Sequence, residues 1–219
     1  MDGFMTYERV KTPKGDTFCV VGEAEPFDGI YVLDTETTGL EGAPRDLVVD
    51  VGICKVSLED GTVEDVYSSV LGYNTDDWDD YHRNAWIFEN TDMTLEMVES
   101  APPALDVIAD VRRILRRKPV TSYNTGYDFT KFLYEEPWSM RGWFVECYDI
   151  MKAATDVCKL PSQYYGSGYK YPTLDYAYSK IVEGDPAGIG GVQDHRALSD
   201  ARMAAHLMIA LKGMGRYEP

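Results

Sequence analysis

Residues 29–40 read GIYVLDTETTGL, an apolar run that ends abruptly in two acidic residues, Asp34 and Glu36. The run has the composition of a buried strand. In a strand, residues i and i+2 point to the same side, so the two carboxylates project together. Two anions that close repel each other unless a proton or a cation lies between them. Because Mg²⁺ and Mn²⁺ prefer carboxylate oxygens, this strand end is a candidate metal site. Taken alone, the pair is better explained by carboxylates that only cap the turn at Gly39, because short motifs often match by accident.

Two further acidic motifs follow along the chain. Asn124 and Asp128 come directly after the short apolar run at residues 120–123, and His195 and Asp200 open the last amphipathic segment. The spacings Asp-x-Glu, Asn-x3-Asp and His-x4-Asp each occur once in the 219 residues, in that order. Three ordered motifs with a strand and helix rhythm between them are far more specific than any one of them alone.

The three segments resemble the three motifs of the DEDDh (DnaQ-like) 3′–5′ exonucleases, a family that includes polymerase proofreading subunits, ribonuclease T and oligoribonuclease. Residues 34–40, DTETTGL, match the first motif of that family in full, and the resemblance extends over residues 29–214. Many relatives have His where this chain has Tyr123, and often Phe where it has Tyr127. Neither difference removes a candidate metal ligand, although substrate preference can depend on them.

The resemblance also implies a set of catalytic residues. If the carboxylates converge, they can hold two Mg²⁺ or Mn²⁺ ions that clamp an in-line phosphoryl displacement. His195 is the expected general base that takes a proton from the attacking water, because histidine side chains exchange protons near neutral pH. The expected metal ligands are Asp34, Glu36, Asp128 and Asp200.

A second group of residues is expected, by the same resemblance, to bind the substrate. The backbone around Thr37, Gly39 and Leu40 is expected to contact the 3′-terminal nucleotide, with the Leu40 side chain under its base. Asn124 is expected to fix the turn that precedes Asp128.

The charge of the chain constrains the substrate. There are 37 acidic and 21 basic residues, a net charge of −16, and this charge repels a polyanion. Residues 56–81 contain eight acidic residues and no Lys or Arg. The basic cluster at residues 112–118 is interpreted mainly as cations that complement a helix C-terminus, with a phosphate-facing patch as the alternative. A short single-stranded end held by metals and local contacts therefore fits better than long nucleic acid held by charge.

Composition also bears on where the protein works. No apolar run approaches the ~20 residues that span a bilayer, and the first residues show no secretory leader. The four cysteines have no metal-binding spacing. A reduced, cytoplasmic protein without membrane contact is expected.

The element order predicts an α/β protein of one domain, and the resemblance implies a ribonuclease H-like fold with a five-stranded mixed sheet flanked by helices. The first three strands are expected to form an antiparallel meander. Residues 73–90 are expected to be a long surface connection, and residues 161–172 a tyrosine-rich loop. The expected strands are residues 30–33, 46–56, 62–71, 120–123 and 143–147, and the expected helices are residues 93–99, 102–118, 126–134, 149–158, 172–182 and 197–211.

Three parts of the chain are expected to differ in role. Residues 1–28 match nothing familiar and are treated as an N-terminal extension of unknown role, in which residues 17–21 are interpreted as an extra edge strand. Residues 29–214 form the expected exonuclease domain, and residues 215–219 form a C-terminal tail.

The leading hypothesis is a metal-dependent exonuclease that hydrolyses phosphodiester bonds from the 3′ end of single-stranded DNA or RNA and releases nucleoside 5′-monophosphates. One alternative is a non-catalytic or accessory nucleic-acid-binding subunit of a polymerase or repair complex, but the chain retains all five candidate catalytic residues. Another alternative keeps the chemistry and acts on a nucleotide or a short oligoribonucleotide. The sequence leaves open DNA versus RNA, and whether the protein pairs with a second copy or with a polymerase or repair protein.

Overall fold

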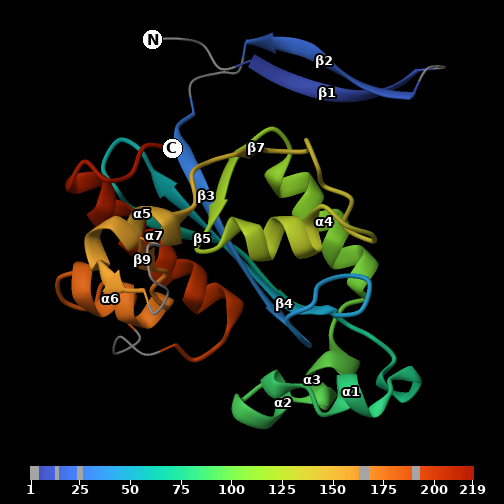
Figure 1. The fold of residues 1–219 in the computed structure, drawn as a ribbon. Coiled ribbons are helices and arrows are strands. Elements are labelled where there is room, and N and C mark those ends of the chain that lie inside the picture. Colours follow the sequence, from blue (N-terminus) through green and yellow to red (C-terminus); the bar gives the residue numbers. More distant parts are fainter. Residues whose placement is uncertain (1–4, 13–14, 24–26, 163–167, 189–192) are drawn as a thin grey trace.

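A five-stranded mixed sheet forms the centre of the computed structural model, which describes residues 5–12, 15–23, 27–162, 168–188 and 193–219 (Figure 1). The strand order is β5-β4-β3-β6-β7. Strands β3, β4 and β5 form the predicted antiparallel meander, and β6 and β7 run parallel to β3. The predicted mixed sheet is therefore confirmed. The strands are β3 (Gly29–Thr37), β4 (Val48–Ser57), β5 (Val63–Val70), β6 (Pro119–Ser122) and β7 (Val145–Glu146).

The central strand β3 is longer than the predicted residues 30–33. The polar residues after Leu33 do not end it, because β4 continues the ladder of hydrogen bonds as far as Thr37. The register shifts between Glu36 and Thr37, the irregularity at which the strand leaves the sheet. By contrast, β7 keeps only two of the predicted residues 143–147.

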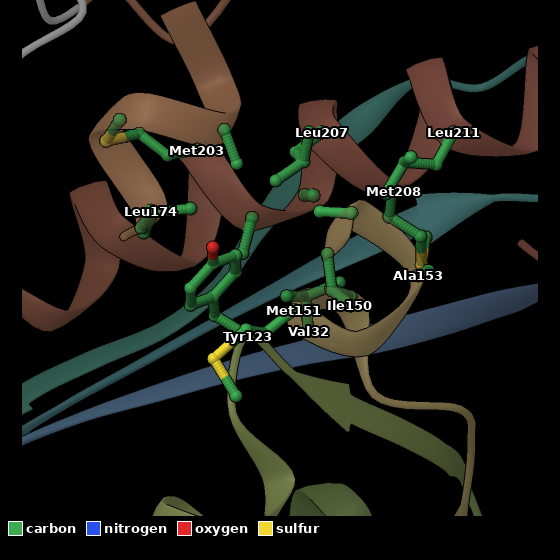
Figure 2. Packing of buried hydrophobic residues seen from close by; sticks show 14 of the residues in the cluster. Val32, Tyr123, Ile150, Met151, Ala153, Leu174, Met203, Leu207, Met208 and Leu211 are labelled. Carbon is green, nitrogen blue, oxygen red and sulfur yellow. The ribbon is translucent and has the colours of Figure 1, made fainter. Parts of the chain in front are cut away.

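Helices cover both faces of the sheet. Val32 and Leu33 are both fully buried, and they belong to different hydrophobic clusters because successive strand side chains point to opposite faces. The cluster around Val32 contains the apolar faces of α5, α6 and α7, as Figure 2 shows. The cluster around Leu33 contains α4 and the π-helical segment η2. The bounds are α4 (Ala104–Leu115), η2 (Gly126–Leu133), α5 (Ile150–Cys158), α6 (Leu174–Ile181) and α7 (Ala197–Gly213).

The segment after β5 is folded into short helices, where the sequence suggested a long connection. Ala85, Ile87, Met93 and Val98 are buried together with Val49 of β4 in a small separate core. This helical insert lies at one end of the sheet, below β4 in Figure 1. Its helices are η1 (Thr75–Asp77), α1 (Asp80–Arg83), α2 (Trp86–Asn90) and α3 (Leu95–Ser100).

The N-terminal segment pairs with itself. Strands β1 (Met5–Thr12) and β2 (Gly15–Glu23) form a two-stranded antiparallel sheet. The interpretation of residues 17–21 as an extra edge strand is thus corrected, because the partner of this strand is β1 and the two form a sheet of their own.

The tyrosine-rich segment is only partly described. Strands β8 (Leu160–Pro161) and β9 (Tyr169–Lys170) pair at its base, and residues 163–167, with two of its tyrosines, lie outside the described residues. In the described part of the chain, no helix has the length and apolar character needed to cross a bilayer.

Candidate active site

Three separate elements bring four carboxylates to one end of the sheet. Asp34 and Glu36 lie near the end of β3, Asp128 lies in the first turn of η2, and Asp200 lies in the first turn of α7. Asp128 and Asp200 are buried, and Asp34 and Glu36 are half-buried. The structure therefore brings together all four of the carboxylates that the sequence singled out.

Burial and crowding raise the pKa values of these carboxyl groups. Burial, followed by the negative charges of Asp128, Asp200 and Glu36, raises the pKa of Asp34 well above its ordinary value. Burial and the charge of Asp200 raise the pKa of Glu36 to about 9. Burial raises the pKa of Asp200 to about 7, although a hydrogen bond from Gln193 opposes the shift. Without a cation, the folded protein holds protons on this cluster.

The donor atoms suit a hard divalent cation. One ligand atom each from Glu36, His195 and Asp200 lie within 4.8 Å of one another. Asp200 Oδ1 is buried and has no hydrogen-bond partner among the described residues. An orphaned carboxylate oxygen beside other carboxylates and an imidazole is an arrangement that Mg²⁺ or Mn²⁺ could satisfy.

His195 is held at the start of α7 in an uncommon backbone conformation. Its φ is +54°, in the left-handed region that a side chain rarely adopts. Its imidazole and the ring of Trp86 from α2 form a T-shaped contact, with ring centroids 5.0 Å apart and an angle of 86° between the ring planes. Trp86 remains 56% exposed at the rim of the site. Sequence reasoning missed Trp86, because no motif near it predicts that the helical insert packs against His195, which lies much later in the chain.

Direct hydrogen bonds join the first motif to the second. Thr35 Oγ1 donates to Asp128 Oδ1 at 2.7 Å, and this bond partly opposes the burial that raises the pKa of Asp128 to about 6. The Tyr127 hydroxyl donates to the carbonyl oxygen of Gly39 at 2.8 Å and lies 2.5 Å from Thr37 Oγ1. Phenylalanine, often found at this position in the family, would lack these hydroxyl contacts. The backbone carbonyl of Asn124 accepts from the Tyr127 and Asp128 amides of η2.

The loop between β3 and β4 forms another part of the rim. Leu40 is 75% exposed at its tip. Asp46 is buried beneath the loop, where it accepts from the Glu41 and Gly42 amides and from the Tyr81 hydroxyl of α1. A Cβ on Gly39 would lie 2.4 Å from Asp46 Oδ1 and 2.5 Å from the Tyr81 hydroxyl oxygen, so a side chain at this position would have to displace the Asp46–Tyr81 pair. Asp46 is a second residue that sequence reasoning missed.

The first turn of α7 rests directly on the backbone of β4. A Cβ on Gly52 would lie 2.2 Å from the Leu198 nitrogen and 2.3 Å from the Ala197 carbonyl carbon. Gly52 pairs with Asp34 across the sheet. Because Gly52 has no side chain, the start of α7, which carries Asp200, can approach β3 and Asp34 closely.

Comparison with known proteins agrees with this geometry. A family model described as an exonuclease, of the ribonuclease T type, matches residues 31–208. The chain belongs to this exonuclease family. The resemblance seen in the sequence is thus confirmed.

Two bacterial proteins show the similarity in sequence. The exonuclease is 26% identical over 181 residues to the PolC-type DNA polymerase III of Thermotoga petrophila, and equally to that of Thermotoga maritima. In each case the match covers 81% of this chain and 11% of the polymerase. The chain thus spans about a ninth of the length of these relatives.

Solved structures show the similarity in fold. A full-length 3′-exonuclease superposes with a TM-score of 0.59 at 15% identity, covering 93% of this chain and 66% of that one. The nuclease domain of the DEDDh enzyme 3′hExo, bound to rAMP, gives 0.55 at 15% identity, covering 88% and 96%. E. coli exonuclease I with an oligonucleotide gives 0.55 at 14% identity, covering 86% and 41%. The predicted fold class is confirmed.

The seating of α7 on Gly52 leads to a prediction about stability. Gly52→Ala should lower the free energy of unfolding by about 2 kcal/mol or more, because the methyl group meets backbone atoms that cannot turn aside. Gly213→Ala is the matched control in α7, since nothing lies within 4 Å of its Cβ, and it should change stability by less than about 1 kcal/mol. Urea denaturation of both variants checks this. Equal stabilities would show that α7 does not need the close approach.

The raised pKa values predict how the stability of the metal-free exonuclease depends on pH. Unfolded carboxyl groups have a pKa of about 4, whereas Asp128, Asp200 and Glu36 reach about 6, 7 and 9 in the folded protein. The folded state binds more protons between these values, so stability falls as the pH rises. In EDTA, the free energy of unfolding should therefore decrease from about pH 5 to about pH 8. Urea denaturation at several pH values measures this.

Two comparisons sharpen the pH measurement. Glu36→Gln should flatten the decrease, because one of the proton-binding carboxyls is gone. Mg²⁺ or Mn²⁺ should restore stability at the upper end of the range, where the carboxylates are free of protons. A metal-free protein whose stability is constant across this range would contradict the clustering of the carboxylates.

Proposed function

We propose that this exonuclease is a divalent-metal-dependent enzyme that acts in the 3′–5′ direction on single-stranded nucleic acid and releases nucleoside 5′-monophosphates. The observation that carries the proposal is the convergence of Asp34, Glu36, Asp128 and Asp200 beside His195. One of their carboxylate oxygens, Asp200 Oδ1, has no hydrogen-bond partner within the ranges that the structure describes. Such a cluster is costly to a fold that has no use for it, because the pKa of each of the four carboxyl groups is raised above its ordinary value.

Each residue has a role in this proposal. The four carboxylates would hold two Mg²⁺ or Mn²⁺ ions, which when bound supply positive charge to the reacting phosphate and to the leaving oxygen. His195 would take the proton of the attacking water at an imidazole nitrogen. The contact with Trp86 restricts the rotation of that imidazole, so the proton acceptor is already oriented when the substrate arrives.

The rim of the site supports a substrate with an unpaired end. Leu40 and Trp86 are exposed apolar side chains on two different elements at the rim, and flat or apolar side chains of this kind favour contact with bases that are not in a duplex. Thr37 ends β3 and donates to the carbonyl oxygen of Gly39, which lies in the loop that carries Leu40. Asn124 starts the turn before Asp128. We assign these four sequence-predicted residues to binding of the terminal nucleotide.

A partnership with a polymerase is a second element of the proposal. The relatives from Thermotoga are PolC-type DNA polymerase III chains in which the matched segment is a small part of the whole. An exonuclease of this kind acting beside a polymerase would receive 3′ ends directly, which suits a chain whose net charge of −16 gives no attraction to long nucleic acid.

Hydrolysis of labelled single strands tests the activity. A 5′-labelled strand with a free 3′ hydroxyl, in Mg²⁺, should shorten one nucleotide at a time, and a strand blocked at its 3′ end should persist. Matched DNA and RNA strands of several lengths then rank the substrates. Shortening from the 5′ end, or undiminished hydrolysis in EDTA, would refute the proposal.

Substitutions separate the roles of the residues. Asp34→Ala and Asp200→Asn should abolish hydrolysis, because each removes a metal-binding carboxylate. His195→Ala should lower the rate by ~10²–10⁴-fold while calorimetric binding of Mn²⁺ survives. Asp106→Asn, in the first turn of α4, is the control and should leave the rate unchanged. Hydrolysis by His195→Ala at the wild-type rate would remove the imidazole from the mechanism.

A further inference from the structure

A fifth carboxylate lies beside the candidate active site, and the motifs do not account for it. Asp50 of β4 pairs across the sheet with Glu36 and is 0% exposed. Its Oδ2 accepts from Arg196 Nε at 2.8 Å and from the Ala197 amide at 3.2 Å. Its Oδ1 has no partner in the described part of the chain. A buried carboxylate next to other carboxylates destabilises the fold unless hydrogen bonds or an opposite charge compensate for its burial.

Those contacts reach the backbone on which the site depends. Arg196 follows His195 directly, and its carbonyl oxygen accepts from the Asp200 amide at 3.1 Å and from Ser199 Oγ at 3.0 Å. Arg196 is therefore joined to Asp50 through its side chain and to Asp200 through its backbone. The Asp50 carboxylate also takes up the Ala197 amide, one of the helix-start donors that have no partner within the helix.

From this arrangement we propose that Asp50 is a positioning residue, which fixes His195 and Asp200 against β3 by holding Arg196 and the first amide of α7. The proposal rests on the function proposed above. It also accounts for the left-handed backbone at His195, because a strained conformation is kept only where neighbouring contacts hold it. Asp50 supplies such contacts to the next two residues, Arg196 and Ala197. Asp50 touches neither metal nor substrate in this role.

The chain contains a matched control for this pair. Asp65 of β5 and Arg202 of α7 form another carboxylate–arginine contact between the sheet and the same helix, with Arg202 Nε 2.8 Å from Asp65 Oδ1. This second pair is more exposed and lies further along α7. Asp50→Asn and Asp65→Asn thus remove the same charge from two pairs that tie one helix to one sheet.

Kinetics of the full chain on a single strand with a free 3′ hydroxyl form the first arm of the test. Asp50→Asn should lower kcat by about 10- to 100-fold with little change in KM, because misplacing a reacting group by about 1 Å costs about that factor. Asp65→Asn should stay within about twofold of the wild type. In a His195→Ala background, Asp50→Asn should lower kcat by a much smaller factor than it does in the wild type, because Asp50 acts through His195. Independent, multiplying losses or an unchanged kcat would overturn the proposal.

Amide hydrogen exchange forms the second arm and needs no activity. In Asp50→Asn, residues 197–200 should exchange about tenfold faster or more, whereas the rest of α7 should keep its protection. If Asp50→Asn does not fold, Arg196→Gln tests the same contact from its more exposed partner and should give the same two results. Unchanged exchange at residues 197–200 would overturn the proposal. If the wild type hydrolyses no strand, the proposed function fails, and exchange alone then decides whether Asp50 positions the helix start.

Discussion

Repulsion among like charges is the constraint on which this structure depends. Burial and the charges of neighbouring carboxylates, Asp200 and Asp128 among them, raise the pKa values of Asp34 and Glu36, so the fold holds the cluster together at a cost in free energy. The fold can bear that cost because two hydrophobic cores, one on each face of the sheet, stabilise the elements that carry the carboxylates. The carboxylates themselves come from a strand end and two helix starts, elements whose backbones are fixed by packing elsewhere. A cation bound between the carboxylates would offset their mutual repulsion. The free energy that this repulsion costs the metal-free fold would then favour binding of the cation.

The parts of the site are joined by contacts that span the sequence. Thr35 donates to Asp128 across 93 positions, and the Tyr127 hydroxyl reaches the Gly39 carbonyl across 88. Strand β4 joins the third motif to the first, since Gly52 admits the α7 backbone and Asp50 binds Arg196. Each of these contacts includes at least one residue that is not a candidate catalytic residue. A site built this way can keep its reactive atoms free for ligands, because other side chains supply the positioning.

These long-range contacts also explain what the sequence could and could not predict. The carboxylates and His195 could be named as candidates because their spacing along the chain is specific. The apolar periodicity of α4 and of the strands is likewise a local signal. The full length of β3 was missed because its polar end is a strand only through pairing with β4. Trp86, Asp46 and Asp50 were missed for a related reason. Each acts through a partner distant in the sequence, and its residue type in isolation is that of an ordinary surface or turn residue.

The arginines of α4 bear on how a strand reaches the site. Arg112 donates through Nε to the Trp138 carbonyl oxygen at 2.8 Å and lies over the Trp143 ring, and Arg113 pairs with Asp110. These contacts tie Arg112 and Arg113 to neighbouring parts of the fold, which argues against a phosphate-facing role for these two arginines. The C-terminal end of α4 leads into the start of β6, whereas the carboxylates lie where β3 ends, at the opposite end of the parallel pair β3 and β6. A polyanion attracted to these arginines would therefore be held away from the carboxylates. Under the proposed function, capture of a substrate would then depend on its terminal nucleotide, through cations at the carboxylate cluster and through Leu40 and Trp86. This dependence would favour short or single-stranded ends over long duplex.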